Sequence, residues 1–208
     1  MSNIKPKLWH SVNTRSLRAL WTLEELGIDY DVELLKFPPR VFHKDYLNIN
    51  PLGTVPYFVD CGVSMTESTA ICQYLVDTYE RFDFGLKPSH SEYGNYLNWL
   101  HQSDATFTFP QALVLRYSQF EPEERRSPQV ADDYSKWFLS RLKNLNSHLK
   151  DNEFLCDDRF TIADIAIGYA LFLGTHTNLS KQYEPQVMAY LERLMSRPAF
   201  KRACNIGA

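Results

Sequence analysis

The segment that decides the fold reads NPLGTVPYFVDCGVSMTESTAICQYL, residues 50–75. Its first letters are turn residues, and an apolar strand follows at residues 55–59 with a proline near its start, where a strand tolerates that residue. The letters DCG predict a hairpin turn into a short strand at residues 63–65. Apolar residues at helical spacing then predict a helix over residues 68–79. The segment therefore predicts a β-β-α unit.

The sequence upstream of this segment predicts a β-α-β unit. A helix fits residues 15–26, which carry leucines on one side and polar side chains, among them Arg18 and Thr22, on another. Residues 30–34 alternate apolar and polar side chains, as a half-buried strand does. Together with a short strand before the helix, these elements complete a small α/β domain over residues 1–80.

The rest of the chain predicts an all-helical domain. Residues 81–91 carry glycine and proline without periodicity and are interpreted as a linker. Beyond it, residues 92–208 show helical patterns, including an apolar run at residues 162–173 that is typical of a buried central helix. A last helix is expected near residues 187–195, stopped by Pro198.

The start of the apolar helix carries a specific signal. Thr161 and Asp164 have the spacing of a capping box, in which each side chain accepts a hydrogen bond from the backbone N–H of the other. Phe160 and Ile165 fit the hydrophobic staple that accompanies such a box. These residues predict that the helix begins at residue 162.

Composition and charge narrow the functional classes. The 208 residues include 22 Lys and Arg against 25 Asp and Glu, a formal charge of −3, which provides no basic stripe for nucleic acid. No apolar run reaches the roughly 18 residues that a membrane span requires. The first residues also lack the apolar centre of a secretory signal. We therefore expect a soluble cytoplasmic protein that binds neither nucleic acid nor a membrane.

The cysteines and histidines do not have the spacing of a metal or redox site. The 4 cysteines form no C-x-x-C pair, and the 6 histidines form no cluster at metal-ligand spacing. We therefore expect no bound metal. The cysteines are interpreted as small buried hydrophobic residues, as is usual in the cytosol.

Several stretches, in this order and at these distances, resemble the cytosolic glutathione transferase family. They are RALWTLEELGIDYDVELL, NPLGTVPYFVD, ESTAICQYL, YLNWLHQSDATF and FTIADIAIGYALFL, which together cover nearly the whole chain. The WTLEELG stretch is most similar to bacterial and fungal members. The resemblance implies an α/β plus all-α fold, in which a thioredoxin-like domain at residues 1–80 precedes a helical domain at residues 92–208, usually as a homodimer.

The resemblance also implies an activity. A member of this family binds glutathione as a co-substrate, lowers the pKa of its thiol and adds the thiolate to a small hydrophobic electrophile. One alternative is a glutathione-dependent disulfide reductase or peroxidase, which needs the same bound thiolate and no protein cysteine. A second alternative is a non-catalytic, transferase-like binding module. The sequence does not identify the electrophile.

The family's thiol contact is expected just after the first strand. The resemblance aligns Ser11 with the catalytic serine of the serine-type classes, and Asn13 with the asparagine that some bacterial and fungal members place near the thiol. Thr14 is the nearest other hydroxyl. These polar residues also suit helix capping, so both interpretations stay open.

Two further segments are expected to bind the backbone of glutathione. Val55 and Pro56 resemble the family's cis-proline step, whose preceding residue pairs with the cysteinyl unit like an added strand. Ser68, at the N-terminal end of a helix, suits the γ-glutamyl carboxylate. Glu67 suits the γ-glutamyl ammonium group. Helix capping with an acidic first turn is the alternative for Glu67 and Ser68.

The remaining expected contacts depart from the family or lie in the helical domain. Arg40 substitutes for the basic or amide residue that often binds the glycyl carboxylate, because the aligned positions hold apolar side chains. Asp104 lies where several classes send an acidic side chain to the partner's glutathione, although a solvated helix face explains it equally well. The candidates for lining the electrophile pocket are aromatic: Trp99, Phe107, Phe109 and Tyr117.

Overall fold

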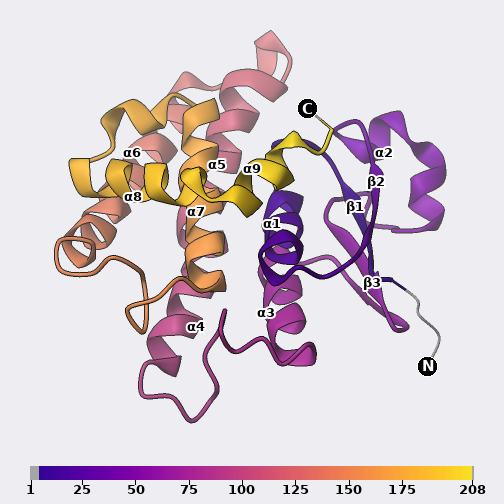
Figure 1. Ribbon diagram of the computed structural model, residues 1–208. Helices are drawn as coiled ribbons and strands as arrows, with labels where there is room; N and C mark the ends of the chain where they lie inside the picture. The colour runs from indigo at the N-terminus through magenta and orange to yellow at the C-terminus, as the bar shows by residue number, and fades with distance from the viewer. Residues whose placement is uncertain (1–4, 208) are drawn as a thin grey trace. The chain divides into compact units, whose positions relative to one another are not determined.

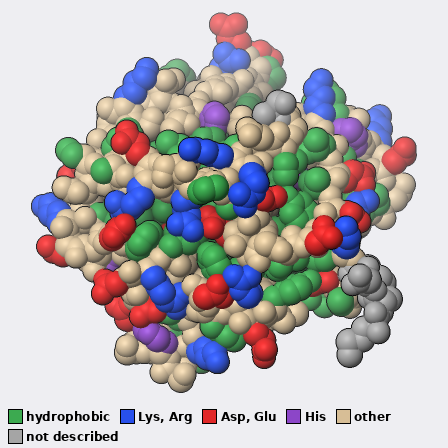
Figure 2. All heavy atoms as spheres, viewed as in Figure 1, with side chains coloured by type: hydrophobic (Ala, Val, Ile, Leu, Met, Phe, Trp, Pro, Cys, Tyr) green, Lys and Arg blue, Asp and Glu red, His purple; other side chains and the backbone are tan. Residues whose placement is uncertain are grey.

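The computed structural model describes residues 5–207, and within it the chain divides into two compact units (Figure 1). One unit runs through Gly85 and also includes the chain from Ser196 onward, whereas the other spans Leu86–Met195. On the face drawn in Figure 2, basic and acidic side chains are interspersed. Among the described residues, no helix is long and apolar enough to span a membrane.

The first unit is built on a four-stranded sheet in the order β2-β1-β3-β4. In chain order its strands are β1 (Lys7–His10), β2 (Asp31–Leu34), β3 (Tyr57–Asp60) and β4 (Val63–Met65). β2 runs parallel to β1, and β3 runs antiparallel to it, so that Leu8 pairs with Val32 on one side and with Phe58 on the other. Leu8 and Phe58 are fully buried and belong to the hydrophobic core of the sheet.

The helices of this unit confirm the predicted β-α-β and β-β-α order. They are α1 (Ser16–Leu26), α2 (Pro39–Phe42), η1 (Lys44–Asn48), α3 (Ser68–Thr78) and α9 (Pro198–Asn205). β3 begins at Tyr57, later than predicted, because Pro56 has no N–H to donate to the sheet. The short elements α2 and η1 lie in a proline-containing stretch that shows no periodicity and were not predicted.

α1 and α3 pack closely against each other through polar side chains. The Arg18 guanidinium donates to Ser68 Oγ at 3.1 Å, and Thr22 Oγ1 lies 3.1 Å from Cys72 Sγ. Arg18 and Thr22 are both 0% exposed, although the sequence pattern indicated a polar helix face. Since the first turns of α1 and α3 contact each other, their N-terminal ends lie side by side.

The C-terminal segment packs with the first unit rather than with the helical one. Phe200 in α9 makes an edge contact with Trp21 of α1, with ring centroids 4.8 Å apart. The guanidinium of Arg197 binds the Glu25 carboxylate at 2.6 and 2.9 Å. Pro198 begins α9 instead of only ending the helix before it, since proline suits the first position of a helix. The helical domain was predicted to extend to residue 208, whereas the chain from Ser196 onward belongs to the first unit.

The second unit is entirely helical. Its elements are α4 (Tyr93–Gln102), η2 (Ser103–Thr108), α5 (Phe109–Leu115), η3 (Arg116–Phe120), η4 (Glu123–Arg125), α6 (Pro128–His148), α7 (Ile162–His176), η5 (Leu179–Gln182) and α8 (Pro185–Ser196). α7 is buried along most of its length, which confirms the predicted central helix. η2 is a π-helical turn, in which the Thr108 hydroxyl donates to the Ser103 carbonyl at 2.6 Å.

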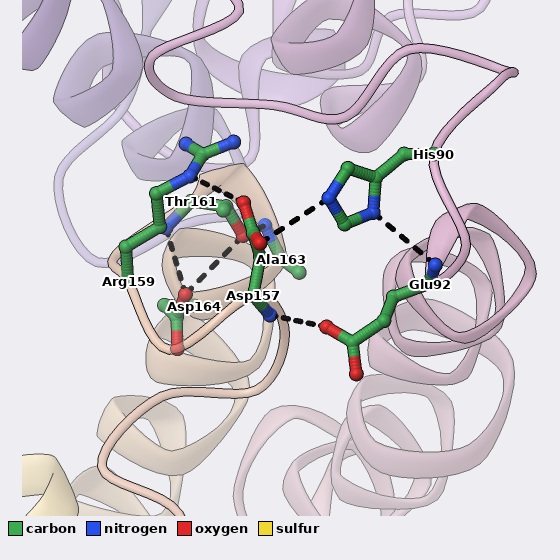
Figure 3. A network of polar contacts seen from close by, with 7 residues as sticks. All are labelled: His90, Glu92, Asp157, Arg159, Thr161, Ala163 and Asp164. Carbon is green, nitrogen blue, oxygen red and sulfur yellow. Dashed lines mark hydrogen bonds and ion pairs between the residues drawn. The ribbon is translucent and has the colours of Figure 1, made fainter.

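The predicted capping box at the start of α7 is confirmed (Figure 3). Thr161 Oγ1 accepts from Ala163 N, and Asp164 Oδ2 accepts from Thr161 N at 2.8 Å. The other oxygen, Asp164 Oδ1, accepts from Leu155 N at 3.1 Å and from the Tyr190 hydroxyl at 2.7 Å. Both oxygens of this buried carboxylate are therefore used.

A second polar cluster joins the loop before α7 to the chain before α4 (Figure 3). Asp157 contacts His90 Nε2 at 3.2 Å and Arg159 Nε at 2.7 Å, and its backbone N–H donates to the Glu92 carboxylate. The two ion pairs hold the pKa of Asp157 below its usual value, Arg159 having the larger effect. The end of the predicted linker is thus fixed to the helical unit.

Candidate active site

The loop between β1 and α1 is where the sequence predicted the thiol contact. Asn13 has a φ of 60°, a left-handed conformation that asparagine tolerates better than most residues. Arg15 precedes α1, and no side chain caps this helix. The polar side chains of the loop are therefore not used as an N-cap, in contrast with the capping interpretation.

Ser16, the first residue of α1, is the centre of a buried hydrogen-bond cluster. Its Oγ lies 2.7 Å from His10 Nδ1 and 2.7 Å from Thr14 Oγ1, and accepts from Ser11 N at 3.3 Å. Thr14 Oγ1 also donates to the Ser11 carbonyl at 2.7 Å. The end of β1 is thus connected to α1 through side-chain hydroxyl groups.

The three candidate thiol contacts have different environments. Ser11 is 1% exposed, and among residues 5–207 its hydroxyl has no hydrogen-bond partner. Asn13 is exposed, and its side chain forms no hydrogen bond to a described residue. Thr14 is half-buried, and its hydroxyl belongs to the Ser16 cluster. The structure therefore brings all three into one loop, and Thr14 alone combines an ordered hydroxyl with partial exposure.

His10 and Ser16 belong to this candidate site, although neither was predicted as a thiol contact. His10 is 1% exposed, and burial lowers the pKa of its imidazole to about 4. It is therefore neutral at neutral pH. Their sequence signal was weak, because a serine or histidine at a strand end or helix start is common and indicates a contact only once its neighbours are known.

The start of α3 presents the two residues predicted to bind the γ-glutamyl group. Glu67 is exposed, and its side chain forms no hydrogen bond to a described residue. Ser68 is 2% exposed and accepts from the buried guanidinium of Arg18. Because a guanidinium can only donate, the Ser68 hydroxyl keeps its own proton for another acceptor. Arg18 is a further residue near the candidate site that the sequence pattern did not single out.

The predicted cis-proline step is present. The peptide bond between Val55 and Pro56 is cis. Thr54, the residue before Val55, is held in place by two hydrogen bonds. Its carbonyl accepts from the Tyr46 hydroxyl at 2.8 Å and from Asn50 Nδ2 at 2.9 Å. Val55 itself forms no backbone hydrogen bond to another described residue. Its N–H and C=O are therefore available to an added strand.

The other predicted contacts lie apart from this group. Arg40 is exposed in α2, next to Gly53, where a Cβ would come within 2.8 Å of the Arg40 Cβ. Asp104 is half-buried in η2 of the second unit. Of the predicted pocket aromatics, Trp99 and Phe107 are buried in the second unit, whereas Phe109 is 58% exposed.

The cysteines and acidic residues of residues 5–207 were compared with the arrangement that a metal site requires. No group of three or more His, Cys, Asp or Glu residues is arranged to hold a metal ion in this part of the chain. Cys72 and Cys156 are buried, as expected, but Cys61 is exposed in the hairpin turn. A hydrogen bond with Asp60 raises the pKa of the Cys61 thiol, so that exposure does not make it a ready thiolate.

Family models match most of the chain. The glutathione S-transferase N-terminal domain matches residues 5–77, and the glutathione S-transferase C-terminal domain matches residues 111–198. The chain belongs to the glutathione S-transferase family. This glutathione transferase has the thioredoxin-like domain and helical domain that the resemblance implied.

Individual relatives agree with the family models. The chain is 30% identical over 205 residues to glutathione S-transferase GstA of Escherichia coli, covering 96% of this chain and 97% of the relative. It is 29% identical over 219 residues to glutathione S-transferase 3 of Schizosaccharomyces pombe, covering 97% and 86%.

Solved structures of the family share the fold. A glutathione transferase from Methylococcus capsulatus superposes with a TM-score of 0.84 at 26% identity, over 97% of this chain and 98% of that chain. One from Phanerochaete chrysosporium, in complex with oxidized glutathione, has a TM-score of 0.83 at 26% identity, over 98% and 96%.

Proposed function

We propose that this glutathione transferase binds glutathione on its first unit, stabilises the thiolate and adds it to a hydrophobic electrophile. The observation that supports this site most strongly is the contact between Arg18 and Ser68, because it holds the N-terminal ends of α1 and α3 side by side. Helix N-termini favour anions. Glutathione carries two kinds of anion that suit them, a thiolate and carboxylates.

Thr14 is the residue that we propose as the thiol donor. A donor must be ordered and must also reach the ligand, and Thr14 meets both conditions. Ser11, the first candidate from the sequence, would have to leave a buried position to reach the ligand. Asn13 is exposed and is the second candidate in this loop.

The energy that such a donor must supply is modest. A free thiol titrates near ~8.5 and is mostly protonated at neutral pH. Lowering its pKa by about two units requires about 2.7 kcal/mol of differential stabilisation. A charge-assisted hydrogen bond from Thr14, together with the positive end of α1, is of the right size.

The remainder of glutathione is proposed to follow the adjacent elements. Ser68 donates its free proton to the γ-glutamyl carboxylate, and Glu67 pairs with the ammonium group. Val55 pairs with the cysteinyl backbone through its unused N–H and C=O. Arg40 is the proposed contact of the glycyl carboxylate, since it is an exposed cation in the segment after β2.

The electrophile pocket and the homodimer are also proposals. We assign the pocket to the helical unit, where Phe109 is an exposed apolar side chain. A homodimer is the usual state of the family, and the exposed apolar side chains of the segment from α2 to β3 support one: Val41, Phe42, Leu47, Ile49 and Leu52. In such a dimer Asp104 is the proposed contact to the partner's glutathione.

The test is a titration with glutathione that follows the heat of binding and the ultraviolet absorbance of the thiolate together. Wild type is expected to bind and to show thiolate at neutral pH. Thr14→Ala is expected to bind but to lose the thiolate absorbance, and its kcat/KM with chlorodinitrobenzene should fall about 100-fold. Ser140→Ala, on the exposed side of α6, is the control and should match wild type.

Two outcomes would contradict the proposal at different levels. If wild type does not bind glutathione, the transferase function itself is wrong for this chain. If wild type binds and forms thiolate but Thr14→Ala does so equally, the function stands and the donor is a different residue. Asn13→Ala, measured in the same way, then tests the second candidate.

A further inference from the structure

The Ser16 cluster is a chain of hydrogen bonds with only one direction that satisfies its three contacts at 2.7 Å. The chain runs from His10 Nδ1 to Ser16 Oγ, then to Thr14 Oγ1 and finally to the Ser11 carbonyl, with each of these three distances at 2.7 Å. The carbonyl can only accept, so the single hydroxyl proton of Thr14 is directed to it in the free enzyme. Thr14 Oγ1 must then accept from Ser16.

This requirement determines the tautomer of His10. If Ser16 donates its only proton to Thr14, it has none left for His10, and His10 Nδ1 must carry a hydrogen and donate to Ser16 Oγ. In the opposite tautomer Ser16 would donate to His10. Thr14 would then face two acceptors at 2.7 Å with one proton, which leaves one close contact between two acceptors. A longer contact of 3.4 Å from Ser16 Oγ to the Ser11 carbonyl does not remove this conflict.

We infer that His10 and Ser16 are positioning residues, which set the direction of this chain so that Thr14 can donate its proton to the glutathione thiolate. The inference rests on the proposed function and adds two residues to it. When a thiolate binds, the Thr14 proton turns from the Ser11 carbonyl to the sulfur. Thr14 Oγ1 keeps accepting from Ser16, and hydrogen bonds in such a chain strengthen one another.

The surroundings of His10 are compatible with this arrangement. Its imidazole is buried, and its low pKa keeps it neutral at neutral pH, so that one ring nitrogen donates and the other accepts. Because a neutral imidazole can hold its proton on either nitrogen, the partners of Nδ1, and not the charge of the ring, determine the direction of the chain. Ser16 also accepts from Ser11 N, which completes two acceptor positions and one donor position on this hydroxyl.

The first test measures the pKa of the bound thiol from thiolate absorbance against pH, at saturating glutathione. His10→Leu and Ser16→Ala should each raise this pKa by about half a unit to one unit, while the Kd of glutathione changes less than about threefold. His10→Asn keeps an N–H close to the Nδ1 position and should return the pKa towards the wild-type value. His101→Leu, at an exposed histidine of α4, is the matched control.

A double variant separates positioning from a general structural effect. If Ser16 acts through Thr14, then Ser16→Ala should add nothing to the thiol pKa once Thr14→Ala is in place. Additive effects in the double variant would overturn the inference. An unchanged thiol pKa in folded His10→Leu and Ser16→Ala would overturn it too.

A second measurement needs no folded variant of this cluster. Imidazole ¹⁵N shifts of wild type at neutral pH identify which nitrogen of His10 carries the proton. A proton on Nδ1 is expected, and a proton on Nε2 would overturn the inference. Glutathione binding by wild type is measured in the same sample, so that failure of the chain can be distinguished from failure of the transferase function.

Discussion

The starts of α1 and α7 differ in how completely their buried polar groups are hydrogen-bonded. Both helices begin at a buried cluster of hydroxyl groups and backbone N–H groups. At α7 the Asp164 carboxylate accepts from four groups, and a threonine caps the helix. At α1 no side chain caps the helix, one buried hydroxyl has no partner among residues 5–207, and Thr14 is partly exposed.

The difference indicates what each helix start can do. A cluster in which every donor and acceptor is used gains stability and offers nothing to a ligand. A cluster in which hydroxyl groups can change partner offers a donor to a bound anion, at some cost in stability. We therefore expect changes near α7 to act on folding and changes near α1 to act on the thiol.

The largest effect is expected for Asp164→Ala. The change leaves the Leu155 N–H, the Thr161 N–H and the Tyr190 hydroxyl buried without their acceptor. We expect the free energy of unfolding to fall by about 4 kcal/mol, measured by urea unfolding with circular dichroism. Asp133→Ala, at an exposed aspartate of α6, is the control and should change it by less than about 0.5 kcal/mol. A loss below about 1 kcal/mol at Asp164 would show that α7 does not depend on this cluster.

The second prediction concerns the pH dependence of the same residue. Burial raises the pKa of Asp164 to about 6, above the value of about 3.9 in an unfolded chain. Between these values the native protein holds a proton that the unfolded chain has lost, so the free energy of unfolding decreases as pH rises from 4 to 6. The contribution is about 3 kcal/mol and is constant above this window.

Urea unfolding of wild type and Asp164→Asn across pH 4 to 7 checks this prediction. Because asparagine does not titrate, the difference between the two unfolding free energies isolates the contribution of Asp164. The opposite slope, with wild type gaining stability relative to the variant as pH rises, would mean that the hydrogen bonds to the carboxylate outweigh its burial.

The third prediction is for Ser68→Ala at the start of α3. This helix start has one hydrogen bond to the protein, as at α7, and one hydroxyl proton left for a ligand, as proposed at α1. Ser68 accepts from Arg18 and keeps one proton for a ligand. We expect the Kd of glutathione to rise about tenfold, by calorimetry, because a hydrogen bond to a charged group is lost. Ser64→Ala, at an exposed serine of β4, should leave the Kd unchanged. An unchanged Kd in Ser68→Ala would remove this residue from the glutathione site.

The parts of the fold that could be predicted are those with local signals. The start of α7 is determined by a threonine and an aspartate three positions apart, and β4 follows a turn that the sequence marks clearly. α9 has no such signal, because proline both ends one helix and begins the next. Its docking depends on Arg197 and Glu25, which are 172 positions apart in the chain.

The site could be predicted as a region but not residue by residue. The sequence indicated the loop after β1, but the pattern of hydroxyl groups does not say which of them points inward. Arg18 and Thr22 have the spacing of a solvent-exposed face, and their partners lie 50 positions away. Periodicity cannot distinguish a polar face in water from one that bonds to another helix.

The smallest effect is expected for Ser11→Ala. This variant tests the comparison of the α1 and α7 helix starts most directly. The Ser11 hydroxyl is buried without a partner among residues 5–207, so removing it leaves no donor or acceptor unpaired. Because a buried hydroxyl without a partner is unfavourable, we expect the free energy of unfolding to rise by up to about 1 kcal/mol, by urea unfolding, and the pKa of the bound glutathione thiol to stay at the wild-type value. Thr14→Ala, measured in parallel, should raise that pKa. If Ser11→Ala raises it instead, the loop must open when glutathione binds, and the serine-type interpretation of the sequence would replace the one based on Thr14.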